Sequence, residues 1–302
     1  MRNRIVELVR QAALERPEVV FVTGDLGFSV VETIQATIGD RFINAGIAEQ
    51  NMVTMSAALS FCGLEPYVYT ITPFVTARSF EQVRNDVCYH NARVRLIGNG
   101  AGFAYGSLGA THHALEDATV MAALPEMTVF SPASNGELDR LFELSDGIAG
   151  PIYYRIGRET GPDGPAPAFD LERPVATWIA GSELNIVTSG SIAGEAFSAA
   201  QTLVSEGLGV RLVTVPILSP FPAAAVLSAL APAPTVLAFE GYAGNPLEAG
   251  LAVAMAEAGW SNKTRFLNAG TSFARTVGTM DFQRTAVGLD RDTIVRTART
   301  LF

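Results

Sequence analysis

Glu49 is the first residue whose type and setting suggest chemistry, and it lies in the stretch RFINAGIAEQNM, residues 41–52. Small and apolar residues surround it, at the point where a loop pattern becomes a helix pattern. A carboxylate near a helix N-terminus is stabilised by the helix dipole. Carboxyl groups among apolar neighbours hold their proton to higher pH and can serve as general acids or bases. The stretch alone leaves open a helix-end charge, an inter-subunit salt bridge and an acid/base group.

His112 and His113 are the next candidates, and they follow a glycine-rich loop, GNGAGFAYG, at residues 98–106. Adjacent histidines on a helix point about 100° apart, so this pair does not chelate as an i, i+4 pair would, and we expect no metal site. A histidine in a loop before a helix can donate a proton or a hydrogen bond to a substrate oxygen. From spacing alone, anchoring of the loop is the favoured role. The loop is no dinucleotide fingerprint, because Phe103 replaces the third glycine.

The composition limits the class of protein. The chain has 302 residues, of which 48% are hydrophobic and 17% charged, which predicts a folded protein with a large core. Its formal charge of −9 excludes a basic surface for nucleic acid. Cys62 and Cys88 stand in apolar helical contexts and are expected to be buried free thiols. The start of the chain reads as an amphipathic helix, and no apolar run approaches the roughly 18 residues of a membrane span, so we expect a cytoplasmic protein.

The elements that must position the candidate residues alternate along the chain. Strand-like apolar runs occur at 19–25, 65–71, 94–100, 127–132, 151–157, 184–190, 210–216 and 235–241, and helical patterns at 1–18, 48–63, 77–90, 113–124, 135–145, 192–207, 223–231, 246–259 and 290–302. Apolar strands separated by helices predict an α/β fold with mainly parallel, helix-covered sheets. A segment rich in Pro, Gly and Asp predicts a linker at 158–177, between domains at 1–157 and 178–302.

Three segments resemble the transketolase family: RFINAGIAEQNM, YTITPFVTARSFEQVRND and GSLGATHHALEDATVMAALPEMTVFSPA. The first domain is similar to the family's pyrimidine-binding domain, and residues 178–302 resemble its C-terminal domain. There is a more distant likeness to 1-deoxyxylulose-5-phosphate synthase and to the β subunits of 2-oxo acid dehydrogenases. The resemblance therefore implies a thiamine-diphosphate enzyme over essentially the whole chain.

The resemblance also implies roles for individual residues. In this family a glutamate hydrogen-bonds the aminopyrimidine of thiamine diphosphate and so promotes loss of the thiazolium proton, and Glu49 matches it. The matches imply that Phe74 stacks on the pyrimidine, that His112 is the active-site histidine, and that Asp25 and Ile71 lie beside the cofactor. The substrate contacts implied or expected from position are Ser29, Leu108, His113 and Arg158.

One family motif, the GDG…N sequence that binds the diphosphate through Mg²⁺, is not found in this sequence. The similar PDGP at 162–165 falls in the expected linker. The resemblance then implies the C-terminal subunit of a split transketolase, which transfers a two-carbon ketol unit between sugar phosphates. A partner subunit with the GDG…N motif would hold Mg²⁺ and the diphosphate, in an α₂β₂ assembly.

Two departures from the family pattern bear on the donor substrate. Gly100 stands where transketolases usually have a histidine, and Leu108 stands where they have an aspartate that contacts donor hydroxyls. An apolar side chain cannot pair a buried hydroxyl, which costs about 1–3 kcal/mol. Two alternatives therefore stay open: a 2-oxo acid decarboxylating acyl transferase acting on a sugar or aldehyde, and a non-catalytic subunit that completes a partner's fold.

Overall fold

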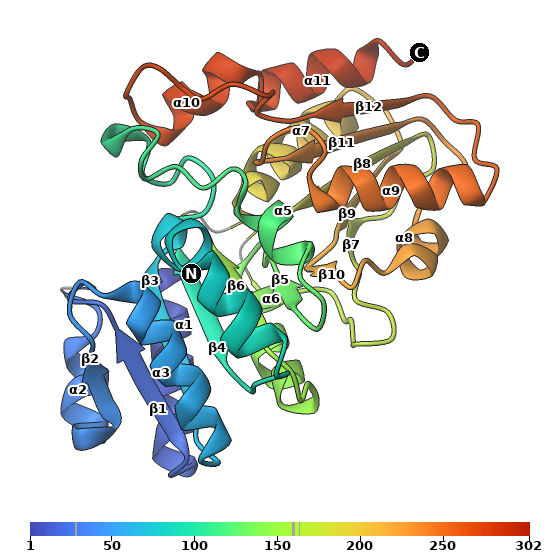
Figure 1. The fold of residues 1–302 in the computed structure, drawn as a ribbon. Helices are drawn as coiled ribbons and strands as arrows, with labels where there is room; N and C mark the ends of the chain where they lie inside the picture. Colours follow the sequence, from blue (N-terminus) through green and yellow to red (C-terminus); the bar gives the residue numbers. More distant parts are fainter. Residues whose placement is uncertain (28, 159–160, 163) are drawn as a thin grey trace.

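The computed structural model describes residues 1–27, 29–158, 161–162 and 164–302, which form two helix-covered sheets (Figure 1). Within these residues the first sheet has seven strands in the order β10-β5-β6-β4-β3-β1-β2, and the second has five in the order β12-β11-β8-β9-β7. The strands are β1 (Val19–Thr23), β2 (Phe42–Asn44), β3 (Glu65–Ile71), β4 (Arg95–Asn99), β5 (Thr128–Phe130), β6 (Ile152–Ile156), β7 (Ala176–Ile179), β8 (Leu184–Ser189), β9 (Val210–Thr214), β10 (Ile217–Ser219), β11 (Thr235–Phe239) and β12 (Thr264–Leu267).

The strands of both sheets are parallel except for β10 and β7, which pair antiparallel at one edge of each sheet. The helices are α1 (Arg2–Glu15), α2 (Glu32–Ile38), α3 (Glu49–Phe61), α4 (Phe80–Gln82), α5 (Asp117–Ala122), α6 (Asn135–Leu144), α7 (Ala193–Ser205), α8 (Ala223–Ala229), α9 (Pro246–Glu257), α10 (Met280–Val287) and α11 (Arg291–Arg299). The predicted α/β class with two mainly parallel sheets is confirmed.

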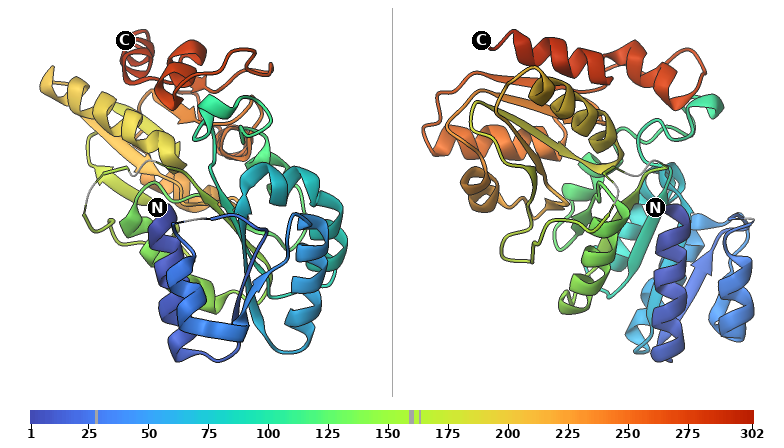
Figure 2. Two further views of the ribbon diagram at one scale, coloured as in Figure 1. Left: turned by 90° about the vertical axis from the view of Figure 1, so that its left-hand side faces the viewer. Right: turned by 180° about the vertical axis from the view of Figure 1, so that it is seen from behind.

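Both faces of the first sheet are buried, which explains why its strands read as continuous apolar runs. Along β1, Val20 and Val22 point into a core shared with α3, whereas Val19 and Phe21 point into a core shared with α1 and α6. Figure 2 shows α1 across the back of this sheet and α11 across the top of the second sheet. Period-two alternation of side chains on a strand therefore supplies two cores from one run of residues.

The two halves of the chain are joined through their sheets. β10 follows β9 of the second sheet, yet it pairs with β5 of the first, with Ile217 opposite Phe130. The core beneath α3 continues without a break to Leu247 and Leu251 of α9. The division into domains at 1–157 and 178–302, with a linker between, stays a prediction, and β7 begins inside the expected linker, at Ala176.

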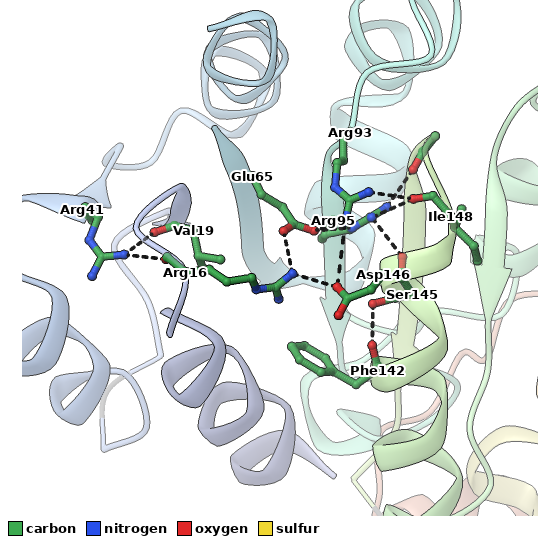
Figure 3. A network of polar contacts seen from close by, with 11 residues as sticks. Arg16, Val19, Arg41, Glu65, Arg93, Arg95, Phe142, Ser145, Asp146 and Ile148 are labelled. Atoms are coloured by element: carbon green, nitrogen blue, oxygen red, sulfur yellow. Dashed lines mark hydrogen bonds and ion pairs between the residues drawn. The ribbon is translucent and has the colours of Figure 1, made fainter. Parts of the chain in front are cut away.

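A buried ionic cluster lies where β3 and β4 begin (Figure 3). The Glu65 carboxylate contacts Arg16 at 3.1 Å, Arg93 at 3.2 Å and Arg95 at 3.1 Å. The Arg95 side chain is fully buried, and its remaining donors go to three backbone carbonyls, those of Ser145, Ile148 and Gly150. These ion pairs and hydrogen bonds hold the amino ends of β3 and β4 together.

Several sequence-based expectations need correction. The helix expected at 113–124 begins at Asp117, because Ala114 pairs with Gly102 in an antiparallel bridge. The helix expected at 77–90 is broken by a π-helical turn at Val83–Cys88, and a further π turn, Phe74–Arg78, precedes α4. The short strands β2, β7, β10 and β12 are not predicted by the sequence patterns. Cys88 is buried as expected, but Cys62 is exposed where α3 ends.

Candidate active site

The candidate residues gather at the carboxyl edge of the first sheet. β1, β3 and β4 run parallel, so the loops that follow them leave from one edge. These loops carry Asp25, Phe74 and His112, and α3 starts there with Glu49, after β2. In open parallel sheets, ligands bind outside the carboxyl ends of the strands. The fold thus brings together side chains that are up to 87 residues apart in the sequence.

Glu49 is the first residue of α3, which has no side-chain cap in the structure. The residue is 2% exposed, and its Oε2 contacts Nη1 of Arg78 at 2.6 Å. Gly24 lies beside the Glu49 side chain, since a Cβ built on it would lie 3.7 Å from Cγ of Glu49. The side chain is therefore packed beside the β1 end, and its carboxylate contacts Arg78.

Phe74 supplies a flat apolar face next to Glu49. It opens the π-helical turn Phe74–Arg78, so the Arg78 side chain folds back over its ring, with Cζ 4.3 Å from the ring centroid. The Arg78 side chain is 45% exposed, whereas the Glu49 side chain that it contacts is 2% exposed. A planar, nitrogen-bearing group thus lies on the Phe74 ring and hydrogen-bonds Glu49 at the same time. The sequence reasoning did not single out Arg78, although its i, i+4 spacing from Phe74 is visible in the sequence.

The two adjacent histidines have different surroundings. His112 is half-buried, and its ring lies edge-on to Phe74 with centroids 5.6 Å apart. His113 is 4% exposed, lies edge-on to Phe103 at 5.1 Å, and contacts the Gly106 carbonyl through Nε2 at 3.4 Å. Burial lowers the pKa of His113. Of the two, His112 therefore lies with Phe74 and Glu49, while the described contacts of His113 are with the loop behind them.

The loop that carries these histidines is tied to the C-terminal half of the chain. The Phe103 amide donates to Oε1 of Glu240 at 3.3 Å, and Arg284 donates to the same oxygen at 2.8 Å. Burial acts to raise the pKa of Glu240, but the charges of Arg284 and Arg155, with the hydrogen bonds from Arg284 and Ser191, together hold it below its usual range. Figure 1 shows the segment between β4 and α5 reaching α10, where the Gly278 amide donates to the Gly106 carbonyl.

Tyr105 is a residue of this site that the sequence reasoning missed. Its half-buried ring lies edge-on to His112, with centroids 6.4 Å apart, and its hydroxyl accepts from Nδ2 of Asn99 at 2.7 Å. Burial raises the pKa of Tyr105, and the positive charges of Arg2 and Arg158 oppose that rise. The candidate Arg158 also donates to the Ala104 carbonyl at 3.4 Å.

The remaining candidates lie at the margin of this site. Asp25 is exposed and is held by Asn44 of β2, whose amide nitrogen is 3.1 Å from its Oδ1. Ser29 has a positive φ of 66° and is exposed. Ile71 ends β3, three residues before Phe74, and Leu108 is 52% exposed in the 3₁₀ turn Gly106–Leu108. The described contacts place none of these four side chains against Glu49.

Two further observations concern the described residues as a set. Among them no three His, Cys, Asp or Glu side chains come together as metal ligands would. In the same part of the chain, none of the helices combines the length and the hydropathy needed to cross a membrane.

A family model described as "Transketolase, pyrimidine binding domain" matches residues 1–161. The chain belongs to the transketolase family. It is 31% identical to an apulose-4-phosphate transketolase subunit of Actinobacillus succinogenes, over 67% of this chain and 65% of that one. It is 30% identical to the 6-deoxy-6-sulfo-D-fructose transketolase subunit SqwH of Clostridium sp., over 75% and 71%. A solved structure described as "Split gene transketolase, inactive beta4 tetramer" is 28% identical, with a TM-score of 0.85, and the match covers 99% of this chain and 98% of that chain.

These likenesses confirm the predicted family and fold class. The chain corresponds to the C-terminal subunit of a split transketolase, and it spans just under two thirds of the length of the first relative named above. It matches the split-gene structure almost from end to end.

Proposed function

We propose that this chain activates the thiamine diphosphate of a split transketolase whose ketose donor carries an anionic group. The observation that carries the proposal is the pairing of Glu49 with the Phe74 face. A planar group with N–H donors, the Arg78 guanidinium, already stacks on that face and hydrogen-bonds that carboxylate. An aminopyrimidine ring has the same two requirements, an apolar face and a hydrogen-bonding carboxyl, so these residues fit the cofactor.

Each residue then has a physical task. When bound, thiamine diphosphate supplies the carbanion equivalent that takes up a two-carbon unit from a ketose. Glu49, which is 2% exposed, would hydrogen-bond a ring nitrogen of the cofactor. Phe74 holds the ring flat, and Arg78 has to release Glu49 for that contact to form. His112, next to Phe74 and half-buried, is placed to move a proton at the donor's hydroxyl or carbonyl oxygen.

The anionic end of the donor fits the basic side of the site. Arg158 donates to the Ala104 carbonyl, next to Tyr105 in the chain, and we assign Ser29 to the same region, as the family resemblance implied. Guanidinium groups bind phosphate and sulfonate through paired N–H donors. The names of two relatives, an apulose-4-phosphate transketolase and a 6-deoxy-6-sulfo-D-fructose transketolase, each specify a sugar with such an anion. We further propose that Asp25 and Ile71 lie beside the cofactor, and that Leu108 and His113 lie beside the substrate.

The partner follows from the cofactor's second end. We propose that an N-terminal subunit with a GDG…N motif holds Mg²⁺ and the diphosphate, in an α₂β₂ complex in the cytoplasm. Ile47, two residues before Glu49, is 80% exposed, and Leu108 is 52% exposed, which suits a surface covered by another chain. The isolated chain is expected to self-associate and to be inactive, like the similar split-gene protein that is described as an inactive β₄ tetramer.

Reconstitution with the N-terminal subunit, thiamine diphosphate and Mg²⁺ tests the proposal. A donor panel should contain a ketose phosphate, a sulfonated ketose and pyruvate, with an aldose phosphate as acceptor. Two-carbon transfer from the ketoses is expected, and turnover of pyruvate alone would favour the 2-oxo acid alternative that Leu108 motivates. Glu49→Ala should lower kcat by at least about 100-fold. Unchanged turnover in that variant would leave this chain a non-catalytic role.

A further inference from the structure

Tyr105 occupies the space that a side chain at position 100 would need. Gly100 has φ +96°, and a Cβ built on it would overlap the Tyr105 ring. The glycine is therefore required by the tyrosine that lies over it. Transketolases usually carry a histidine at the position of Gly100, so the glycine removes one polar side chain. The Tyr105 side chain, with its phenol hydroxyl, lies over the Cα of Gly100 instead.

The Tyr105 hydroxyl is oriented by the end of β4. Asn99, the last residue of that strand, is 3% exposed and donates from Nδ2 to the phenol oxygen at 2.7 Å. A tyrosine oxygen that accepts this bond keeps its own O–H free to donate to another acceptor. Within the described residues, Oδ1 of the same asparagine is buried and has no protein partner. The phenol thus has a hydrogen to donate, and the asparagine that holds it has a buried acceptor without a protein partner.

Tyr105 has two candidate residues of the proposed site beside it, His112 and Arg158. His112 is on one side, at 6.4 Å between ring centroids, and through it the Phe74 ring at a further 5.6 Å. The carbonyl of the residue before Tyr105, Ala104, accepts from Nη1 of Arg158 at 3.4 Å. A ketose whose carbonyl carbon lies near His112 and whose anion lies near Arg158 would present its middle hydroxyls to Tyr105.

We infer, on the basis of the proposed function, that Tyr105 is a specificity-determining residue that donates a hydrogen bond from its phenol to a chain hydroxyl of the sugar donor, with Asn99 holding it in place. Tyr105 thereby supplies a hydrogen bond to the donor that Gly100 and Leu108 cannot make. It also favours a hydroxylated ketose over a 2-oxo acid, since pyruvate has no hydroxyl to receive the bond.

The test uses the reconstituted complex and a matched pair of donors. One donor is a ketose phosphate, and the other is hydroxypyruvate, a ketol donor without the sugar hydroxyls beyond the transferred unit. Tyr105→Phe removes only the hydroxyl and is expected to lower kcat/KM about 10-fold with the ketose phosphate, mainly through KM, and less than about 2-fold with hydroxypyruvate. Tyr89→Phe, at an exposed position, is the control and should change neither value.

A second variant keeps the inference testable if the first perturbs the loop. Asn99→Ala removes the group that orients the phenol, so its effect on the ketose phosphate should not add to that of Tyr105→Phe in the double variant. Equal losses with both donors, additive effects, or no loss with the ketose phosphate would each overturn the role of Tyr105. If the unmodified complex transfers no ketol unit from any donor, the proposed function itself fails, which is a different outcome.

Discussion

Glu65 at the amino edge of the first sheet and Glu49 at its carboxyl edge are both buried carboxylates paired with arginine, at 4% and 2% side-chain exposure. Glu65 contacts three arginines, and the most buried of these, Arg95, also donates to backbone carbonyls. Glu49 has a single arginine partner in the described structure, and that side chain is 45% exposed. Glu65 therefore keeps its arginine partners, whereas Glu49 can exchange Arg78 for another planar hydrogen-bond donor.

The contrast shows that burial and pairing alone do not mark a functional carboxylate. What differs is the freedom of the partner. Arg95 cannot leave Glu65 without abandoning several hydrogen bonds in a dry interior, which is costly. Arg78 can leave Glu49 by swinging into water, where it regains hydration.

Glu65→Gln should cost about 3–5 kcal/mol of unfolding free energy, because it leaves the fully buried Arg95 without its counter-charge. The measurement is the urea-unfolding midpoint of the isolated chain at fixed protein concentration. The matched variant Glu49→Gln should cost less than about 1 kcal/mol, because Arg78 reaches solvent. Equal losses in the two variants would erase the distinction between the edges.

Arg78→Met should strengthen binding of thiamine diphosphate to the assembled complex, by up to about 5-fold, since no guanidinium then has to be displaced from Glu49. Calorimetric titration of the complex at a fixed Mg²⁺ concentration measures this directly. Arg84→Met, a change on the neighbouring turn, serves as the control. Weaker binding in Arg78→Met would mean that this arginine contacts the bound cofactor and does not compete with it.

His113, near the carboxyl edge of the first sheet, is 4% exposed, and its burial should make the stability of the chain depend on pH. Burial lowers the pKa of His113 in the folded chain. As pH falls below about 6.5, the unfolded chain therefore binds a proton at this histidine before the folded chain does. The free energy of unfolding falls with pH until the folded chain is protonated as well. The thermal midpoint should therefore fall less between pH 7.5 and 5.5 in His113→Gln than in the unmodified chain. The exposed His90, changed to Gln, should leave the pH dependence as it was.

The two cysteines offer the mildest test, since labelling changes little else. Burial raises the pKa of the Cys88 thiol to about 12, whereas Cys62 is exposed at the end of α3. At pH 8 a disulfide reagent should modify one thiol per folded chain and two in denaturant. Rapid reaction of both thiols in the folded chain would show that the helices around Cys88 open readily.

The sequence predicted the parallel sheets and the central chemistry because these depend on local patterns. Apolar runs marked β1, β3 and β4, and the block around Glu49 carried the family resemblance. Tyr105 and Arg78 escaped notice for a different reason. Their roles depend on which side chain folds over which, and the π turn that brings Arg78 onto Phe74 has no periodic signature. Long-range pairings such as β10 with β5 are likewise invisible along the chain.

The pairing of β10 with β5 limits how this chain can be rearranged in evolution. A three-residue strand from the second half closes an edge of the first half's sheet, and an open edge invites aggregation. A recombination event that exchanged only the C-terminal half would have to import a strand matched to β5 or leave that edge bare. Inheritance should therefore keep the two halves together as one module, even in a family whose genes are known to divide.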